Sequence, residues 1–333
     1  MRILLLTISV LLAGCAQWSG LPPASSTMAP VQATPISKCV NLGSALEADF
    51  EGQWGYIVRR SDLVRIKRAG FDTIRLPVRW SSHADQEKPY TIDPELLARV
   101  DQIVGWAEQI GLNIIVNVHH FSGLNRNPNQ HEPRLEGIWD QLATHYAGAG
   151  EFLIFETINE PHSEMTVART DAINVRLLQR IRQDHPDRWV IIGTADWGQL
   201  EGLQASKPEF AERVILTFHE YQPFDFTHQG APWTNREETG LKWGARTDVA
   251  EMMQRLDAAQ AIQSSTGMPV FVGEFGVFRE VPVKQRARWT ETLREGIEAR
   301  GMSWCYWDFA GDLKVYDVEA EAWIPELKAA LLD

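Results

Sequence analysis

The sequence predicts a single (β/α)8 TIM barrel of the α/β class, on the basis of two observations. First, eight short apolar runs rich in β-branched and aromatic residues recur along the chain, as is typical of parallel strands buried on both faces. Second, segments with the apolar period of an amphipathic helix separate these runs. A doubly wound sheet would be expected to begin with a glycine-rich turn, which this sequence lacks. The alternation therefore favours a closed barrel.

The predicted strands and helices divide residues 38–333 into eight repeats of one domain. The strands are expected at residues 39–43, 72–78, 113–120, 152–159, 189–194, 214–221, 269–275 and 302–309. The clearest helical segments are residues 94–110, 172–182 and 284–299, and Gly111 follows the first of them as a typical helix stop. In such a barrel the active site lies at the carboxyl ends of the strands.

The N-terminal segment predicts export and lipid attachment. In residues 1–14, Arg2 precedes an apolar run at residues 3–12, which is too short to span a bilayer and typical of a signal peptide. Residues 11–15 resemble the lipobox of bacterial lipoproteins, which implies that Cys15 becomes the lipidated first residue. Cleavage of an ordinary signal peptide is the alternative. By the same resemblance, Ala16 in place of an aspartate implies sorting to the outer membrane.

A disordered tether is predicted for residues 15–37. These residues are rich in Pro, Ser, Ala, Thr and Gln and have almost no charge, so they cannot bury enough apolar surface to fold. The expected location is therefore an outer membrane lipoprotein that faces the periplasm or the cell surface, with a secreted protein as the alternative.

Two cysteines remain beyond the tether, Cys39 and Cys305, in the predicted first and last strands. Export would permit a disulfide between them. Two buried thiols are nevertheless expected, because neighbouring parallel strands seldom meet the narrow geometry of a disulfide.

The charge and composition of the chain restrict its partners. The net charge of -12 disfavours nucleic acid, because such binding depends on basic side chains that neutralise phosphates. No glycine-rich phosphate loop follows a predicted strand, so no nucleotide cofactor is expected. The 13 tryptophans are many for 333 residues, and such rings either fill a core or stack on flat ligands such as sugars. A neutral polysaccharide is compatible with these properties.

Polar and aromatic groups gather where six of the predicted strands end. They are Arg75 in the second strand, His119 and His120 in the third, Asn159 and Glu160 in the fourth, His219 and Tyr221 in the sixth, Glu274 in the seventh and Trp307 in the eighth. A lone histidine or glutamate is more often a structural group, but each buried polar side chain costs free energy unless it finds a partner. Their coincidence at one end of a barrel therefore indicates a functional site.

Glu160 and Glu274 are the candidate catalytic pair. Two carboxyl groups are the minimum for cleavage of a glycosidic bond, one as a protonated acid and one as an ionised carboxylate. Glu160 lies between the amide of Asn159 and the rigid Pro161, and a partly buried carboxyl near another negative charge is expected to have a raised pKa. It is therefore assigned as the acid and Glu274, which lies between two glycines, as the nucleophile. The two carboxyl groups are expected about 5 Å apart.

Arg75 and Tyr221 are natural donors that would hold Glu274 ionised, and Asn159 would donate to a sugar hydroxyl. Trp307 offers a flat face beside the reacting sugar ring.

Three further tryptophans are either sugar platforms or core residues. They are Trp80, Trp197 and Trp233. Trp233 is expected to be the most exposed of them, because it lies in a turn-rich loop.

Six short motifs carry a family resemblance. They are Ile74-Arg-Leu-Pro-Val-Arg-Trp80, Val118-His-His120, Phe155-Glu-Thr-Ile-Asn-Glu-Pro161, Phe218-His-Glu-Tyr-Gln-Pro223, Gly273-Glu-Phe-Gly276 and Tyr306-Trp-Asp-Phe309. Together they resemble glycoside hydrolase family 5, the cellulase and mannanase group of retaining (β/α)8 enzymes. The functional residues of that family would fall on Arg75, His119, Asn159, Glu160, His219, Tyr221, Glu274 and Trp307. In that family the glutamate of the fourth strand is the acid/base and the glutamate of the seventh strand is the nucleophile.

The resemblance implies a retaining endo-β-1,4-glucanase that acts on β-glucan as a monomer. A β-mannanase or another β-glucanase of the same family is the alternative, because the motifs do not choose the sugar.

Two functions from other classes are alternatives to this one. A surface-anchored glycan-binding lipoprotein without activity would be expected to have lost a carboxylate, and both are present. A metal-dependent barrel hydrolase would use His119 and His120 with an acidic residue. Adjacent strand residues point to opposite faces, so these two are not expected to share an ion, and no metal is predicted.

Overall fold

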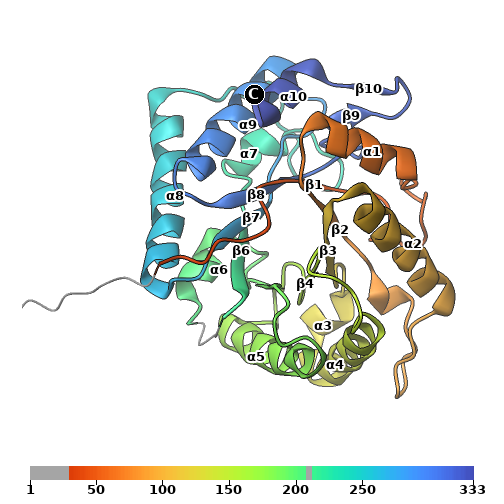
Figure 1. The fold of residues 1–333 in the computed structure, drawn as a ribbon. Coiled ribbons are helices and arrows are strands. Elements are labelled where there is room, and N and C mark those ends of the chain that lie inside the picture. Colours follow the sequence, from red (N-terminus) through yellow and green to blue (C-terminus); the bar gives the residue numbers. More distant parts are fainter. Residues whose placement is uncertain (1–29, 208–211) are drawn as a thin grey trace, which may run out of the picture.

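The computed structural model describes residues 30–207 and 212–333 and confirms the predicted (β/α)8 barrel. Eight parallel strands pair in sequential order, and the last strand pairs with the first to close the ring. Helices surround the strands on the outside (Figure 1). The predicted signal peptide, Cys15 and the predicted tether up to residue 29 lie outside the described residues.

All eight predicted strands are present, but they are shorter than the apolar runs. They are β1 (Lys38–Asn41), β2 (Thr73–Leu76), β3 (Asn113–Asn117), β4 (Leu153–Glu156), β5 (Val190–Ile192), β6 (Val214–His219), β7 (Val270–Glu274) and β8 (Ser303–Tyr306). Residues 118–120, 157–159, 220–221 and 307–309 lie in the loops that follow the strands. Most of the predicted site residues therefore stand on these loops, as in other barrels of this type.

The outer layer consists of helices that follow the strands. The long ones are α1 (Arg60–Ala69), α2 (Pro94–Ile110), α4 (Pro128–His145), α5 (Val167–Asp184), α8 (Arg246–Thr266), α9 (Val283–Glu298) and α10 (Pro325–Leu332). Short elements in the loops are a 3-10 turn (Trp80–Ser82), α3 (Ser122–Arg126), α6 (Leu200–Ala205), α7 (Phe224–Thr227) and the pair β9 (Tyr316–Asp317) and β10 (Ala322–Trp323). Among the described residues, no helix combines the length and the apolar character that a membrane span requires.

Helix α2 shows why local sequence sets the ends of these helices. It spans the predicted residues, and Asp93 caps its first turn by accepting a hydrogen bond from the amide of Glu95. Gly111 ends it with a φ of 77°, a conformation that favours glycine. Helix α5 begins five residues before the predicted position 172, whereas α9 differs from its prediction by one residue at each end.

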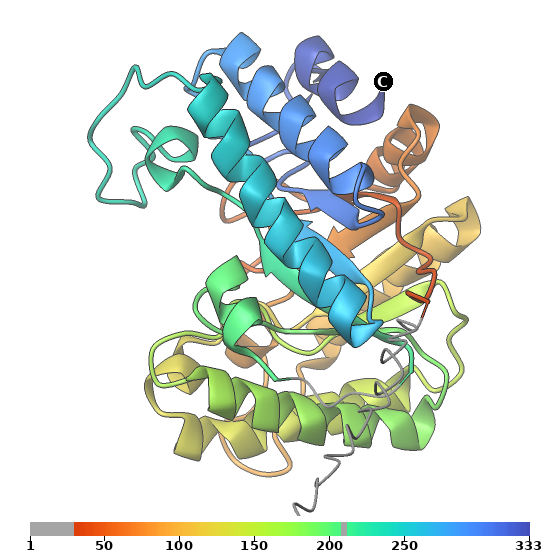
Figure 2. The same ribbon diagram turned by 90° about the vertical axis from the view of Figure 1, so that its left-hand side faces the viewer.

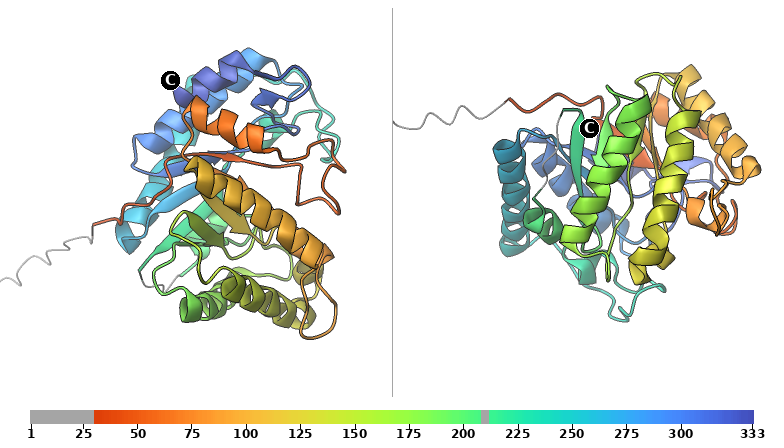
Figure 3. Two further views of the ribbon diagram at one scale, coloured as in Figure 1. Left: turned by 45° about the vertical axis from the view of Figure 1, so that its right-hand side comes forward. Right: turned by 90° about the horizontal axis from the view of Figure 1, so that it is seen from below.

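Helices α4 and α5 lie side by side on one flank of the barrel (Figures 2 and 3). Three arginines of α5 alternate with three acidic residues of α4 at distances of 2.5 to 2.8 Å. They are Arg169, Arg176 and Arg180 on α5, with Glu132, Glu136 and Asp140 on α4. This ladder of ion pairs holds the two helices in register.

The barrel interior toward the amino ends of the strands is filled with apolar side chains. They are Ile36, Cys39, Ile115, Ile154, Trp189, Ile191, Ile215, Phe271 and Cys305. The chain before β1 lies against this end of the barrel, because Asn113 donates to the carbonyl oxygen of Pro35 at 2.9 Å and the amide of Arg213 donates to Gln32 at 3.2 Å. The opposite end of the interior is left for polar residues.

Cys39 and Cys305 form a disulfide, so the expectation of two free thiols is wrong. The two residues are register partners on β1 and β8, both are fully buried, and their Cα atoms are 4.2 Å apart. The expectation rested on the general rarity of disulfides between neighbouring parallel strands. The sequence does not reveal that these two strands approach so closely at the cysteines. The bond joins residues 266 positions apart and closes the seam between the first and last strands.

Candidate active site

A cleft of about 1140 Å³ opens at the carboxyl ends of the strands. It brings together most of the predicted site residues, namely His119, His120, Glu160, Trp197, His219, Tyr221, Trp233, Glu274 and Trp307. Arg75 and Asn159 are buried and bond to each other and to the catalytic pair's network. The carboxyl ends of β3 to β8 and the loops that follow them thus contribute these lining residues to one cleft.

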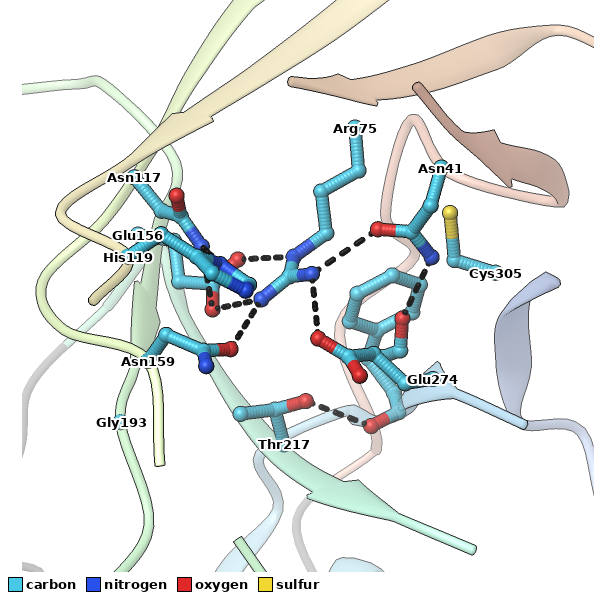
Figure 4. Close-up of polar contacts among 12 residues, drawn as sticks. Asn41, Arg75, Asn117, His119, Glu156, Asn159, Gly193, Thr217, Glu274 and Cys305 are labelled. Carbon is cyan, nitrogen blue, oxygen red and sulfur yellow. Dashed lines mark hydrogen bonds and ion pairs between the residues drawn. The ribbon is translucent and has the colours of Figure 1, made fainter. Parts of the chain in front are cut away.

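Arg75 is the centre of the buried polar network (Figure 4). It donates to both carboxylate oxygens of Glu156 at 2.6 and 2.7 Å and to Oε1 of Glu274 at 2.8 Å. Its remaining hydrogens bond to the amide oxygens of Asn41 at 2.8 Å and Asn159 at 2.7 Å, so all five donors are used. Burial alone lowers the pKa of Arg75, but Glu156 and Glu274 outweigh it and raise that pKa. The group is therefore a permanent cation.

Glu274, the last residue of β7, is held on both carboxylate oxygens. Oε1 accepts from Arg75, and Oε2 accepts from the hydroxyl of Tyr221 at 3.1 Å and lies 3.6 Å from Nδ1 of His219. A Cβ at Gly273 would lie 3.1 Å from Nε2 of His219, so glycine lets β7 approach this ring. The carboxylate is thereby fixed in one orientation.

Glu160 stands opposite Glu274. It follows β4 in the left-handed conformation with a φ of 45°, and its side chain is 25% exposed, against 6% for Glu274. Its Oε1 lies 2.6 Å from Nδ1 of His219. One carboxylate oxygen of each glutamate and a ring nitrogen of His219 all lie within 4.8 Å of one another. This agrees with the separation of about 5 Å that a retaining pair requires.

The pKa values of the pair differ from the predicted pattern. For Glu160, burial raises the pKa, but the hydrogen bond and charge of His219 outweigh it and the net shift is downward. For Glu274, burial raises the pKa by more than His219 and Arg75 lower it. Burial lowers the pKa of His219, but Glu274 and Glu160 outweigh burial, so the net shift is upward. The expectation of a raised pKa at Glu160 itself is wrong, because the sequence did not place His219 beside it.

His119 and His120 both line the cleft, although adjacent strand residues would face opposite sides. Both follow Asn117, the last residue of β3, so the alternation of a strand does not apply to them. Their ring centroids are 4.6 Å apart, and His119 stacks on Trp307 with centroids 5.6 Å apart. Burial lowers the pKa of each histidine, so both rings are neutral near pH 7.

Three tryptophans stand about half exposed at the rim of the cleft. Trp197 is 53% exposed and Trp233 is 49% exposed, so both are rim residues, but the expectation that Trp233 is the most exposed of the three is wrong. Trp54, also 49% exposed, was missed because no motif or chemical pairing marked it. Trp80 is fully buried and donates to the carbonyl oxygen of Asn117 at 2.9 Å, so it is a core residue.

Sequence reasoning also missed two of the four buried partners of Arg75. Glu156 is a lone charge inside the apolar run of β4, and such a charge signals a buried ion pair. Asn41 lies in β1 and donates to the carbonyl oxygens of Gly273 at 3.1 Å and Tyr306 at 3.3 Å. Both residues are visible in the sequence, but the sequence does not indicate that Arg75 is their common partner.

Glu160, His219 and Glu274 are the one group of acidic and histidine side chains, within the described ranges, that is close enough to hold a cation. His119 and His120, which a metal-dependent hydrolase would have used, are not part of this group. His219 and Glu274 already have Glu160 and Arg75 as partners.

Comparison with known proteins agrees with this geometry. The family described as "Cellulase (glycosyl hydrolase family 5)" matches residues 32–312. Endoglucanase H from Acetivibrio thermocellus is 31% identical over 325 residues, which cover 95% of this chain and 35% of that protein. The chain thus spans about a third of the length of that relative.

Solved structures give the same result. Endoglucanase Cel5A from the hyperthermophilic Thermotoga maritima is 36% identical with a TM-score of 0.86, covering 89% of this chain and 96% of that one. A structure of Cel5A with mannotriose is 34% identical with a TM-score of 0.87, and the match covers 89% of this chain and 97% of that one. The family match extends over nearly the whole barrel, and both candidate carboxylates lie within it. The chain therefore belongs to glycoside hydrolase family 5.

Proposed function

We propose that this chain is a retaining endo-β-1,4-glucanase that cleaves β-glucan. The observation that carries the proposal is the approach of the Glu160 and Glu274 carboxylates to within 4.8 Å in the cleft. Retaining glycosidases hold their two carboxyl groups about 5–5.5 Å apart, whereas inverting enzymes need about 6.5–9.5 Å to admit a water. The short separation supports a double displacement.

In the first step, the Glu274 carboxylate attacks the anomeric carbon while Glu160 gives the proton that it shares with His219 to the departing glycosidic oxygen. Arg75 and Tyr221 orient Glu274 and stabilise its charge before the attack. Glu160 is the more exposed carboxyl, so the leaving sugar and then water can reach it. The products of this step are a glycosyl ester on Glu274 and a free sugar end.

In the second step, Glu160 takes a proton from water, and the water oxygen attacks the anomeric carbon and releases Glu274. The His219 ring at 2.6 Å stabilises the ionised form of Glu160 between the two steps. Because both steps invert the anomeric carbon, the product keeps the β configuration.

Asn159 supports the same reaction through its side-chain amide. Its oxygen accepts from Arg75 at 2.7 Å, so its NH2 group remains to donate to a hydroxyl of the sugar. A bond of this kind that strengthens in the transition state contributes to the rate.

The shape of the cleft favours attack within a long chain. Trp54 follows β1, and Trp197 and Trp233 follow β5 and β6, on the opposite side of the eight-stranded ring. Exposed rings on both sides of the catalytic pair offer platforms for sugars before and after the cleaved bond. Similar structures are described as complexes with cellobiose and with mannotriose, so β-mannan is the second candidate substrate.

The test is hydrolysis of barley β-glucan, carboxymethylcellulose, glucomannan and laminarin by the wild-type protein and by Glu160→Gln and Glu274→Gln. We expect oligosaccharides from β-1,4-linked glucans and a loss of at least about 100-fold in kcat for each variant. Glu164→Gln, a change of an exposed residue, is the matched control. Binding without hydrolysis by the wild type would support a non-catalytic glycan-binding protein instead.

We further propose that Cys15 carries the lipid that holds the protein at the outer membrane, where it acts as a monomer. The lipobox at residues 11–15 supports this proposal. Residues 30–37 reach β1 at the amino end of the barrel, so an anchor there would leave the cleft, at the other end, open to polysaccharide. A Cys15→Ser variant should leave the membrane fraction, and continued membrane association would contradict the lipid. Size-exclusion chromatography tests the monomer.

A further inference from the structure

The turn between β5 and α6 contains three consecutive residues in the left-handed conformation. The φ angles are 57° at Asp196, 59° at Trp197 and 70° at Gly198. Residues other than glycine seldom adopt this backbone conformation. A run of three left-handed residues, two of them not glycine, therefore persists only where the surrounding structure holds it. We call residues 196–198 the acid-side turn, because it lies against Glu160.

Two backbone hydrogen bonds tie the acid-side turn to both halves of the acid/base pair. The amide of Trp197 donates to the carbonyl oxygen of Pro161 at 3.3 Å, directly after Glu160. The amide of His219 donates to the carbonyl oxygen of Gly198 at 2.7 Å. The turn therefore joins the segment that carries the acid to the segment that carries its hydrogen-bond partner.

The backbone is closely packed on both sides of the acid-side turn. A Cβ at Gly193, before the turn, would lie 2.2 Å from the carbonyl oxygen of Ile158. A Cβ at Gly202, after the turn, would lie 2.2 Å from the carbonyl oxygen of Ala195. Both glycines lie so close to neighbouring backbone that no larger residue fits at either position.

Gly198 is where the acid-side turn meets the reacting groups. A Cβ on this residue would lie 3.2 Å from Nδ1 of His219 and 3.3 Å from Cγ of Glu160. These distances are tighter than ordinary van der Waals contact, so the ring or the carboxyl would have to shift by a few tenths of an ångström. The same Nδ1 forms the 2.6 Å bond to Glu160, so the shift would change the contact that governs the acid's proton.

We propose that Gly198 is a positioning residue that sets the geometry of the Glu160–His219 pair. The proposal rests on the glycosidase function proposed above. The acid-side turn also carries Trp197, whose ring stacks on His162 with centroids 3.4 Å apart. Nδ1 of His162 lies 2.7 Å from the carbonyl oxygen of Glu160. One turn thus joins an exposed candidate platform for sugars to the group that protonates the leaving oxygen.

The experiment compares two substrates that differ in their need for an acid. Cleavage of cellotetraose needs a proton on the leaving oxygen, whereas dinitrophenyl β-cellobioside has a leaving group that departs without one. For Gly198→Ala we expect kcat/KM to fall about tenfold or more on cellotetraose, but less than about threefold on the activated substrate. The basic limb of the pH profile on cellotetraose should also move.

Gly111→Ala is the matched control. Gly111 has a similar φ of 77° at the end of α2, and a Cβ there meets nothing within 4 Å. Gly111→Ala therefore introduces a backbone strain similar to that of Gly198→Ala, but no contact with Glu160 or His219. We expect equal kinetics on both substrates and an unchanged pH profile.

Gly198→Asn separates strain from contact at the site itself. Asparagine tolerates the left-handed conformation better than alanine and still adds a Cβ. We therefore expect that Gly198→Asn, like Gly198→Ala, loses more kcat/KM on cellotetraose than on the activated substrate. An equal loss on both substrates, or no loss on cellotetraose, would overturn the proposal, as would failure of both Gly198 variants to fold. A wild-type protein that hydrolyses neither substrate would instead refute the glycosidase function.

Discussion

At the scale of single residues, one buried cation balances two buried carboxylates. Arg75 is fully buried and places all five hydrogens on four side chains, among them Glu156 and Glu274. Removal of one partner from a buried ion pair leaves an uncompensated charge, which costs several kcal/mol. We therefore expect Arg75 to contribute both to the stability of the barrel and to the ionisation of Glu274, the proposed nucleophile.

Arg75→Met is expected to impair both the stability of the barrel and the ionisation of Glu274. We expect the free energy of unfolding to fall by about 3–5 kcal/mol and kcat/KM to fall by at least about 100-fold, because Glu274 loses the cation that keeps it ionised. Urea unfolding and steady-state kinetics measure the two effects. Arg68→Met, a change on the exposed face of α1, is the control. A stability loss of less than about 1 kcal/mol for Arg75→Met would contradict the role of the network.

The pH dependence of activity should follow the shifted groups. Burial raises the pKa of Glu274 above 4.5, and the nucleophile must be ionised, so activity should fall as the pH drops through that raised value. Glu274 and Glu160 raise the pKa of His219 above 6.5 despite its burial, so the acid/base pair should lose its last proton above pH 6.5. The profile of kcat/KM should therefore be bell-shaped, with its basic limb above 6.5. A basic limb below that value would be inconsistent with a shared proton.

The residues at the strand ends could be predicted because barrel geometry brings all such ends to one face. The partners of these residues could not, since partner choice depends on distances between strands that are far apart in sequence. Glu156 and Asn41 were missed for this reason, and the pKa direction at Glu160 was wrong because it depends on His219.

At the scale of elements, the positions of strands and helices followed from apolar patterns and caps, whereas their ends often did not. The apolar run of β3 continues through Val118 into a loop, so the predicted strand was too long. The early start of α5 was missed because residues 167–171 of that helix carry little apolar signal. The ion-pair ladder between α4 and α5 likewise depends on how the two helices face each other.

Glu136→Gln tests the strength of that ladder. Glu136 pairs with Arg176 at 2.8 Å and Arg180 at 2.7 Å, but both arginines are about 35 to 42% exposed, so solvent screens the pairs. We expect the free energy of unfolding to fall by about 1 kcal/mol or less, with a smaller difference in 1 M NaCl. Glu108→Gln on α2, an exposed position, is the control. A difference that grows with salt would show that the ladder does not act through charge.

At the scale of the whole molecule, the disulfide and the hydrogen bonds of β1 with β8 close the ring. The bridge spans 266 positions, so the loop that it closes contains almost the entire domain. Long loops of this kind lose the most conformational freedom in the unfolded chain when they are crosslinked. The fold class could be predicted without the bridge, because eight alternations of strand and helix without a glycine-rich first turn already favour a barrel.

The double variant Cys39→Ala/Cys305→Ala is expected to keep the fold and lose about 2–5 kcal/mol of unfolding free energy. Guanidinium unfolding under oxidising conditions measures the loss. Ile115→Val removes volume from the same interior cluster and leaves the bridge intact, so it controls for lost packing at about 0.5–1.5 kcal/mol. A double variant no less stable than this control would show that the bridge contributes little.

We propose that Glu160 and Glu274 act on opposite sides of one glycosidic bond by double displacement. The most direct measurement is an NMR time course of a soluble β-1,4-glucan oligosaccharide, recorded before the anomers of the product equilibrate. Because Glu274 lies within 4.8 Å of Glu160, we predict that the β-anomer appears first and the α-anomer follows only by mutarotation. Initial release of the α-anomer would mean direct attack by water and would contradict the assignment of Glu274 as the nucleophile.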